Sequence, residues 1–215
     1  MQPQSYWPIP YRKPINLHAA KNLLRFVWKF GQDLKIIDVG DGLIQFKFAM
    51  ESQLLWVVNN GLWSFDNHIL LLRCWEKGMT PFSVQFLQIP IWVQVWGLPF
   101  DLINAELGRD IGNGIGHVID IDCKAISSEQ AHFRRIRVEM PLNKPIRRGA
   151  PANSPEGDKV WVAFQYERLL VLYFNCGFLG HEAKVCSMLR FGEGNESPYG
   201  DWLRASFRRQ KEARR

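Results

Sequence analysis

Two hydrophobic periodicities alternate along this chain, and their order limits the fold more than any other feature of the sequence. Apolar residues recur at helical spacing between Leu17 and Phe30, and Asn16 is placed to cap that helix. Strand-like stretches follow in LKIID and LIQFKF, which VGDG joins, and they predict a hairpin. The start of the chain therefore combines one amphipathic helix with two paired strands.

The same order continues through the next thirty residues or so. ESQLLWVVNNG indicates a short second helix, and the turn residues Asp66 and Asn67 separate the strand-like LWSF and HILLLRCW. Helix, hairpin, helix and strand is the order of an α+β open sandwich of the RNA-recognition or ferredoxin-like type. Such a sandwich begins with a strand, which here would have to come from YWPIPY.

The second half repeats the theme with more strand. Ile91, Val93 and Val95 alternate with Trp92, Gln94 and Trp96, which predicts a half-buried strand, and a helix is expected from about Asp101 to Ile111. The remaining strands are expected in HVIDIDC, in FRRIRVEM, and in a pair from KPIRRG to VWVAFQYE across the turn-rich APANSPEGD. We therefore predict that a second, mostly antiparallel α/β half extends the first sandwich.

Three segments are expected along the chain. The 215 residues are 47% hydrophobic and 22% charged, so most of the chain should fold around a core. We assign residues 1–168 to the α/β domain, 169–187 to a small segment resembling a zinc knuckle, and 188–215 to a basic tail.

Charge and composition narrow the compartment and the partners. The formal net charge of +6 favours polyanion partners such as nucleic acid. No stretch has the length of a signal peptide core or a membrane span, so we expect a soluble intracellular protein, in the nucleus or cytoplasm, without membrane contact. Cys74 and Cys123 lie far apart in strand-like stretches and are expected to be reduced core cysteines.

The segment YFNCGFLGHEAKVC carries the chemistry. Cys176, His181 and Cys186 hold the second, third and fourth ligand positions of a CxxCxxxxHxxxxC zinc knuckle. So short a segment cannot bury a core of its own, and the metal supplies the folding free energy, about 10 to 16 kcal/mol in small zinc peptides. Three of the four ligands are therefore present.

Tyr173 stands where the first cysteine ligand belongs. A phenol with a reference pKa of about 10 is a poor zinc ligand near neutral pH, so zinc binding is expected to be weak or absent. The site could take a water as fourth ligand, recruit Cys123 or Cys74, or keep its shape by packing without zinc. An open position is also found in catalytic zinc sites, but only Glu182 lies close enough in sequence to act as a base.

Aromatic and basic residues in the same segment match what a knuckle uses on nucleic acid. Phe174 and Phe178 could stack on unpaired bases, and Lys184 could meet phosphate. The alternative for Phe174 is a role in the small core of the knuckle.

A second basic group precedes the knuckle. Arg135 and Arg137 project from one face of FRRIRVEM, and Lys144, Arg147 and Arg148 follow, which predicts a phosphate-binding stripe or, as the alternative, a solvated face. The tryptophans of the strand patterns are more often core residues, although Trp92 and Trp96 share the face opposite the apolar one and could stack on bases. Asp120 and Asp122 share a strand face, but without a third ligand they make a weak metal or acid–base site.

The knuckle-like segment is similar to retroviral nucleocapsid knuckles, and the rest of the chain extends the resemblance. The stretches GLWSFDNHILLLRCWEKGMTP, IWVQVWGLPF, IGNGIGHVIDID, FRRIRVEM and FQYERL resemble a plant domain-of-unknown-function family that precedes a CCHC zinc knuckle in non-LTR retrotransposon-derived, gag-like proteins. The resemblance implies an RNA-recognition-like domain, zinc ligands at Cys176, His181 and Cys186, and binding of RNA or other nucleic acid. The chain departs from the family at Tyr173.

From these features we expect a protein that is not an enzyme and that binds RNA or single-stranded nucleic acid. The alternative is a protein interaction or assembly module, such as a homo-oligomer, that has lost nucleic-acid and zinc binding. Steep salt dependence of RNA binding would favour the first and a stable oligomer indifferent to RNA the second.

Overall fold

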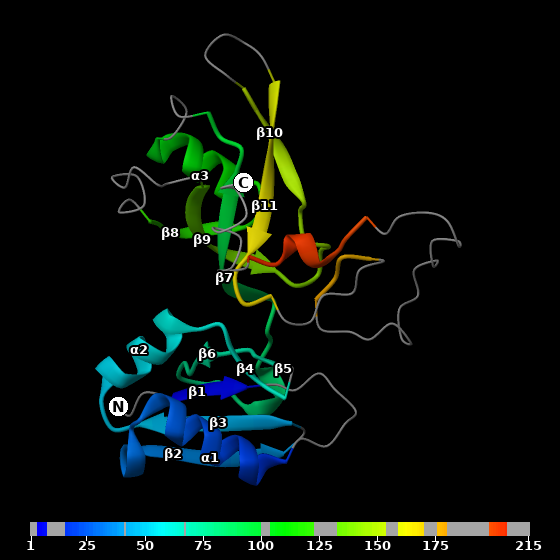
Figure 1. The fold of residues 1–215 in the computed structure, drawn as a ribbon. Coiled ribbons are helices and arrows are strands. Elements are labelled where there is room, and N and C mark those ends of the chain that lie inside the picture. The colour runs from blue at the N-terminus through cyan, green and yellow to red at the C-terminus, as the bar shows by residue number, and fades with distance from the viewer. Residues whose placement is uncertain are drawn as a thin grey trace, which may run out of the picture. The chain divides into compact units, whose positions relative to one another are not determined.

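The chain folds into a mixed α+β structure with two compact units. The computed structural model describes residues 4–7, 16–40, 42–66, 68–99, 104–122, 133–153, 159–169, 176–179 and 198–205. The units are Met1–Leu87 and Gln88–Arg215, and within the described residues they contain three α-helices and antiparallel sheets (Figure 1). The predicted fold class is confirmed, whereas the boundaries expected at residues 168 and 187 stay predictions.

The first unit has the strand order of an RNA-recognition-like sandwich. Its four-stranded antiparallel sheet runs β2-β3-β1-β6, so that the first and third strands lie at the centre. Its main elements are β1 (Gln4–Trp7), α1 (Leu17–Trp28), β2 (Leu34–Gly40), β3 (Leu43–Phe48), α2 (Glu51–Asn60) and β6 (Arg73–Cys74). The strand expected from YWPIPY is β1, which includes Tyr6 and Trp7.

Smaller elements complete the first unit. The strand-like LWSF and the start of HILLLRCW form the paired strands β4 (Trp63–Phe65) and β5 (His68–Leu70), whereas the single strand expected over HILLLRCW is divided, since its end forms β6 in the other sheet. Two short 3-10 turns are η1 (Gly31–Asp33) and η2 (Pro81–Ser83).

Aromatic side chains fill the core of the first unit. Trp28 of α1 is buried and meets Phe46 edge-on, with the ring centroids 5.2 Å apart. The helix begins where the sequence predicts, because Asn16 Oδ1 accepts a hydrogen bond from the Ala19 backbone N–H at 3.1 Å. It ends two residues before the expected Phe30, since Lys29 adopts the left-handed conformation.

The second unit repeats the order of the first. Its sheet runs β10-β11-β7-β9-β8, so that β7 and β9 occupy the central places that β1 and β3 occupy in the first unit. Its elements are β7 (Gln88–Trp96), α3 (Ala105–Asn113), β8 (His117–Ile121), β9 (Phe133–Pro141), β10 (Gly149–Asn153), β11 (Lys159–Tyr166) and η5 (Asp201–Leu203). Strand β10 takes the position in the chain order that α2 has in the first unit.

The alternation in IWVQVW sorts the second sheet into two faces. On one face, Gly112 of α3 lies directly against Val118 and Ile136, and this face forms the core, which is built largely of buried side chains of the two central strands: Ile89, Ile91, Val93, Val95, Ile136 and Val138. The opposite face carries the tryptophans and polar residues of the same strands.

Three predictions need correction. The strand expected in KPIRRG lies instead at Gly149–Asn153, inside the stretch assigned to a turn; β10 is an edge strand of the described sheet, which tolerates Pro151 because its outer side needs no donor. Helix α3 begins at Ala105 rather than Asp101, with Asn104 as its cap. Cys74 is exposed, not a core cysteine, because β6 is a two-residue edge strand; Cys123 lies outside the described residues.

Candidate nucleic-acid interface

The polar face of the second sheet brings together residues from three strands. Trp92 and Gln94 of β7 stand opposite Arg137 and Arg135 of β9. On the other side of β7, Glu167 follows the end of β11, and its backbone N–H donates to the carbonyl of Trp92 at 2.9 Å. The predicted common face of Arg135 and Arg137 is therefore part of the sheet's open side.

Arg135 is held from several directions. Its Nε and Nη2 donate to the two carboxylate oxygens of Glu167 at 2.9 and 2.7 Å, and its Nη1 lies 3.6 Å from Asp122 Oδ2. The guanidinium carbon lies 4.1 Å from the centre of the Trp92 ring. Because two carboxylates already neutralise it, Arg135 fixes the position of Trp92 more readily than it offers charge to a phosphate.

The second tryptophan of the strand is fixed as well. Trp96 donates its indole N–H to Gln94 Oε1 at 3.2 Å, and Gln94 Nε2 donates to Glu167 Oε1 at 3.0 Å. Gln94 is itself buried. Glu167 therefore anchors both halves of one network that orients Trp92 and Trp96.

Arg137 lies deeper than a surface phosphate contact would. Its residue exposure is only 7%, and burial lowers the pKa of its guanidinium, while the nearby carboxylates of Asp120 and Glu139 act in the opposite direction. Its guanidinium is therefore shielded from solvent.

Arg147 and Arg148 differ from the two sheet arginines. Both are exposed, and their guanidinium groups donate to backbone carbonyls: Arg147 to Gly114 at 2.7 Å and Arg148 to Pro198 at 3.4 Å. In the part of the chain that the structure describes, neither forms a salt bridge with a carboxylate. Of these four arginines, Arg147 and Arg148 are therefore the two whose charges are available to a polyanion.

The buried phenol of Tyr166 is hydrogen-bonded to the backbone that carries this arginine pair. Its hydroxyl donates to the Arg147 carbonyl at 2.7 Å, and burial raises the pKa of the phenol well above its ordinary value. The Phe164 backbone N–H donates to the Arg148 carbonyl at 2.9 Å. The backbone carrying both arginines is thus bonded to β11.

The described part of the knuckle-like segment is docked on the second unit. The Gly177 carbonyl accepts a hydrogen bond from the Ile146 backbone N–H at 2.9 Å. Gly177 has a φ of +72°, and the ring of Tyr199 lies against it so closely that a Cβ there would overlap the ring. The turn that starts at Cys176 is therefore fixed beside the arginine pair.

Only part of the predicted metal site falls within the described residues. Cys176 is 4% exposed and sits at the tight turn expected of a thiolate ligand, so its position and chemistry fit zinc. His181, Cys186 and Tyr173 lie outside the described residues. Among those described, no group of three or more histidine, cysteine or acidic side chains could hold a metal ion.

The predicted base-stacking residues are divided in the same way. Phe178 is described and half-buried, next to the docked turn. Phe174 and Lys184 lie outside the described residues, and their roles stay predictions.

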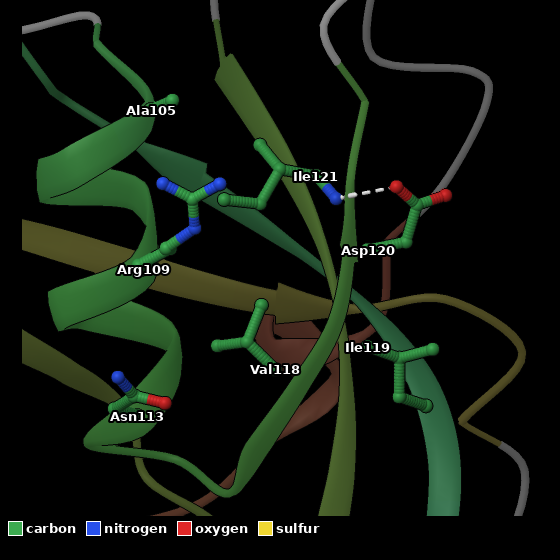
Figure 2. A pocket seen from close by; sticks show the side chains of 7 residues that line it. All are labelled: Ala105, Arg109, Asn113, Val118, Ile119, Asp120 and Ile121. Atoms are coloured by element: carbon green, nitrogen blue, oxygen red, sulfur yellow. Dashed lines mark hydrogen bonds between the residues drawn. The ribbon is translucent and has the colours of Figure 1, made fainter.

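A groove of about 370 Å³ lies between α3 and β8, away from the network. Figure 2 shows Arg109, Val118 and Ile121 pointing into the space between helix and strand, whereas the carboxylate of Asp120 lies on the far side of the strand. That carboxylate accepts a hydrogen bond from the Ile121 backbone N–H at 2.8 Å. The groove thus combines apolar walls with one cation.

The sequence pattern does not reveal the residues that hold the side chains of the polar face in place. Glu167 and Gln94 join the tryptophans and Arg135 through contacts that span up to 73 positions. The alternation in FQYE could have placed Glu167 on the same face as Gln165, but only the pairing of β11 with β7 brings it to Trp92. Tyr199, which covers Gly177, lies in a stretch without any periodic signal.

Comparisons with known proteins agree with this layout. Residues 6–83 match the model of a domain of unknown function, DUF4283, and residues 140–188 match a zinc knuckle model. The second match includes β10 and β11 together with the docked turn. The predicted order, a region similar to a domain of unknown function followed by a region similar to a zinc knuckle, is therefore confirmed.

One relative gives a further similarity. The chain is 25% identical over 138 residues to the "Uncharacterized protein At4g02000" of Arabidopsis thaliana. These aligned residues make up 64% of this chain and 43% of the relative. The alignment thus spans less than half of that protein's length.

Within the described residues, no helix is both long and apolar enough to cross a membrane.

Proposed function

We propose that this protein binds single-stranded nucleic acid, RNA in preference, without catalysing a reaction. The observation that carries the proposal is the docking of the knuckle turn beside Arg147 and Arg148, through the hydrogen bond between Ile146 and Gly177. A turn similar to zinc knuckles and two arginines without carboxylate partners in the described chain are thereby held together.

Phosphate contacts supply most of the affinity in this proposal. Exposed arginines release counterions from the nucleic acid when they bind, which makes such affinity depend on salt. Arg147 and Arg148 fill this role, whereas Arg135 and Arg137 act chiefly by shaping the sheet, because Arg135 is paired with Glu167 and Arg137 is buried. The net charge of +6 supports the same partner class.

Zinc would be held by Cys176, His181 and Cys186. When bound, it would supply cross-linking of the knuckle backbone rather than chemistry on a substrate. The contacts of Gly177 with Ile146 and Tyr199 give the turn support that does not depend on the metal. Weak zinc binding, expected from Tyr173, is compatible with a folded turn.

The origin of the protein is part of the proposal. The order of a DUF4283-like region and a zinc-knuckle-like region supports descent from a gag-like protein of a non-LTR retrotransposon, acting on RNA in the nucleus or cytoplasm.

The direct test is a titration of the purified full chain with a short fluorescent single-stranded RNA, followed by anisotropy at low salt. Double-stranded DNA and single-stranded DNA serve as competitors, and a parallel titration contains a zinc chelator. We expect binding, with single-stranded competitors displacing the probe better than the duplex.

A matched pair of variants separates the site from overall charge. Arg147→Gln with Arg148→Gln should weaken binding about tenfold or more, since each lost phosphate contact reduces affinity at low salt. Arg25→Gln with Lys77→Gln removes the same charge from exposed positions of the first unit and should have a smaller effect.

The assembly module remains the alternative outcome. Absence of RNA binding at low salt would overturn the proposal. Sedimentation of the same sample would then show whether the chain forms the homo-oligomer that this alternative requires.

A further inference from the structure

The open face of the second sheet carries three tryptophans in a row across two neighbouring strands. Trp92 and Trp96 belong to β7, and Trp161 of β11 lies two residues from Ala163, the partner of Trp96. Because side chains alternate along a strand, Trp161 shares the face of Trp96 and is its diagonal neighbour. The described helix of this unit packs on the opposite face, where Gly112 meets Val118 and Ile136.

Trp161 is the most accessible of the three. Its residue exposure is 61%, yet its indole lies close to β10, because a Cβ at Gly149 would come within 2.7 Å of Trp161 Cζ2. A glycine at this place of β10 lets the indole approach the backbone. Part of the indole therefore contacts the sheet, while much of the surface of Trp161 stays exposed to solvent.

The other two indoles are held in place. The guanidinium of Arg135 stacks on Trp92 at 4.1 Å, and Trp96 donates its N–H to Gln94. Their orientation is fixed before any ligand arrives, so little conformational entropy is lost on binding.

The chemistry of this face fits nucleobases better than phosphates. Around the tryptophans, Arg135 is already paired with Glu167 and Asp122, and Arg137 is buried, so neither presents a free charge to a phosphate backbone. Indoles held by side-chain contacts on an open sheet face offer π-faces, which is how unpaired bases are received on a sheet. Uncompensated cations lie elsewhere on the same unit, at Arg147 and Arg148.

We propose that Trp161, with Trp96 and Trp92, forms a stacking platform for the unpaired bases of single-stranded RNA. This inference rests on the proposed function and assigns phosphate and base contacts to two different places. The arginine pair near the knuckle contacts phosphate, and the sheet face binds bases. Nothing in the sequence patterns singled out Trp161.

The test compares two probes on the full chain. One is fluorescent oligouridine, and the other is an abasic oligomer of the same length, which has the phosphates without the bases. The wild-type protein should prefer oligouridine, and Trp161→Leu should lose about tenfold in affinity for it, as expected for one stacked base. Its affinity for the abasic oligomer and its salt dependence should not change.

Two further variants control for folding and for general hydrophobicity. Trp161→Leu keeps an apolar side chain over Gly149, while Trp161→Phe restores a π-face and should recover most of the affinity. Trp56→Leu removes a tryptophan of comparable accessibility from α2 of the first unit and should leave the preference for oligouridine intact.

The outcomes separate the two proposals. RNA binding that is the same in wild type and Trp161→Leu, or equal affinity of the wild type for both probes, would overturn the platform while leaving the proposed function standing. Failure of the wild type to bind either probe would remove the proposed function and the platform with it.

Discussion

Arg135 and Glu167 form a two-point ion pair that spans the central strand of the second sheet. The pair joins β9 to the residue after β11 with distances of 2.9 and 2.7 Å, and it passes over Trp92 of β7. The side chains are only 33% and 12% exposed, so water screens the pair less than a surface salt bridge.

Glu167→Gln is therefore expected to destabilise the second unit by about 1.5 to 3 kcal/mol, the range for hydrogen bonds to charged groups. The matched control is Glu76→Gln, which removes the exposed partner of Arg73 at 3.6 Å and should cost about 0.5 kcal/mol or less. Urea unfolding of both variants measures the difference. Equal losses of unfolding free energy in the two variants would mean that the ion pair over Trp92 stabilises the protein no more than an exposed salt bridge does.

Gly177→Ala should loosen the docked knuckle turn. Its φ of +72° disfavours a side chain, and the Tyr199 ring occupies the space that a Cβ would need. The Ile146 amide, which donates to the Gly177 carbonyl, should then exchange its hydrogen faster with deuterated solvent. Gly78→Ala has a φ of +93° without a neighbour within 4 Å and should leave Ile146 unaffected. Unaltered exchange in Gly177→Ala would contradict the docking.

Tyr166→Phe should lower stability at neutral pH and alter its dependence on alkali. Loss of the hydrogen bond to the Arg147 carbonyl costs about 1 kcal/mol at pH 8. In the wild type the folded phenol has a raised pKa, so above about pH 10 the unfolded chain releases this proton first, and the stability contributed by Tyr166 falls as the pH rises.

The stability difference between wild type and Tyr166→Phe should accordingly narrow between about pH 8 and about pH 10.5. Urea unfolding at the two pH values measures it, and the other tyrosines contribute equally to both proteins. A gap that stays constant would show that the buried phenol does not control the alkaline response.

Tyr173→Cys should raise zinc affinity markedly, because it adds the missing thiolate to Cys176, His181 and Cys186. Competition with a chromophoric chelator measures the affinity, and Tyr173→Phe serves as the control that removes the hydroxyl without adding a ligand. An affinity unchanged by the cysteine would show that another residue already completes the site.

The sequence predicts most elements of the fold because their periodicity is local. Alternation located β7, and Asn16 located the start of α1, since both signals depend on neighbours within a few residues. Strand β10 was misplaced because Pro151 looked like a turn residue, and only its position at the sheet edge makes the proline acceptable.

The candidate site was less accessible to prediction. That Arg135 and Arg137 share a face follows from alternation, but the ion pairs of Arg135 and the burial of Arg137 depend on strand pairing. Likewise, the seat of Trp161 on Gly149 and the cover of Tyr199 over Gly177 arise from contacts between distant segments. Spacing predicts Cys176 as a zinc ligand, whereas the docking of its turn becomes apparent only in three dimensions.

The most direct measurement of the central claim is the salt dependence of RNA affinity in the wild type and in Arg147→Gln with Arg148→Gln. Over about 50 to 200 mM salt, the slope of log affinity against log salt should be steep in the wild type and shallower by about 1.4 in the double variant, since each phosphate contact to a single strand contributes about 0.7. Identical slopes in the two proteins, or RNA affinity indifferent to salt, would contradict phosphate binding by this arginine pair.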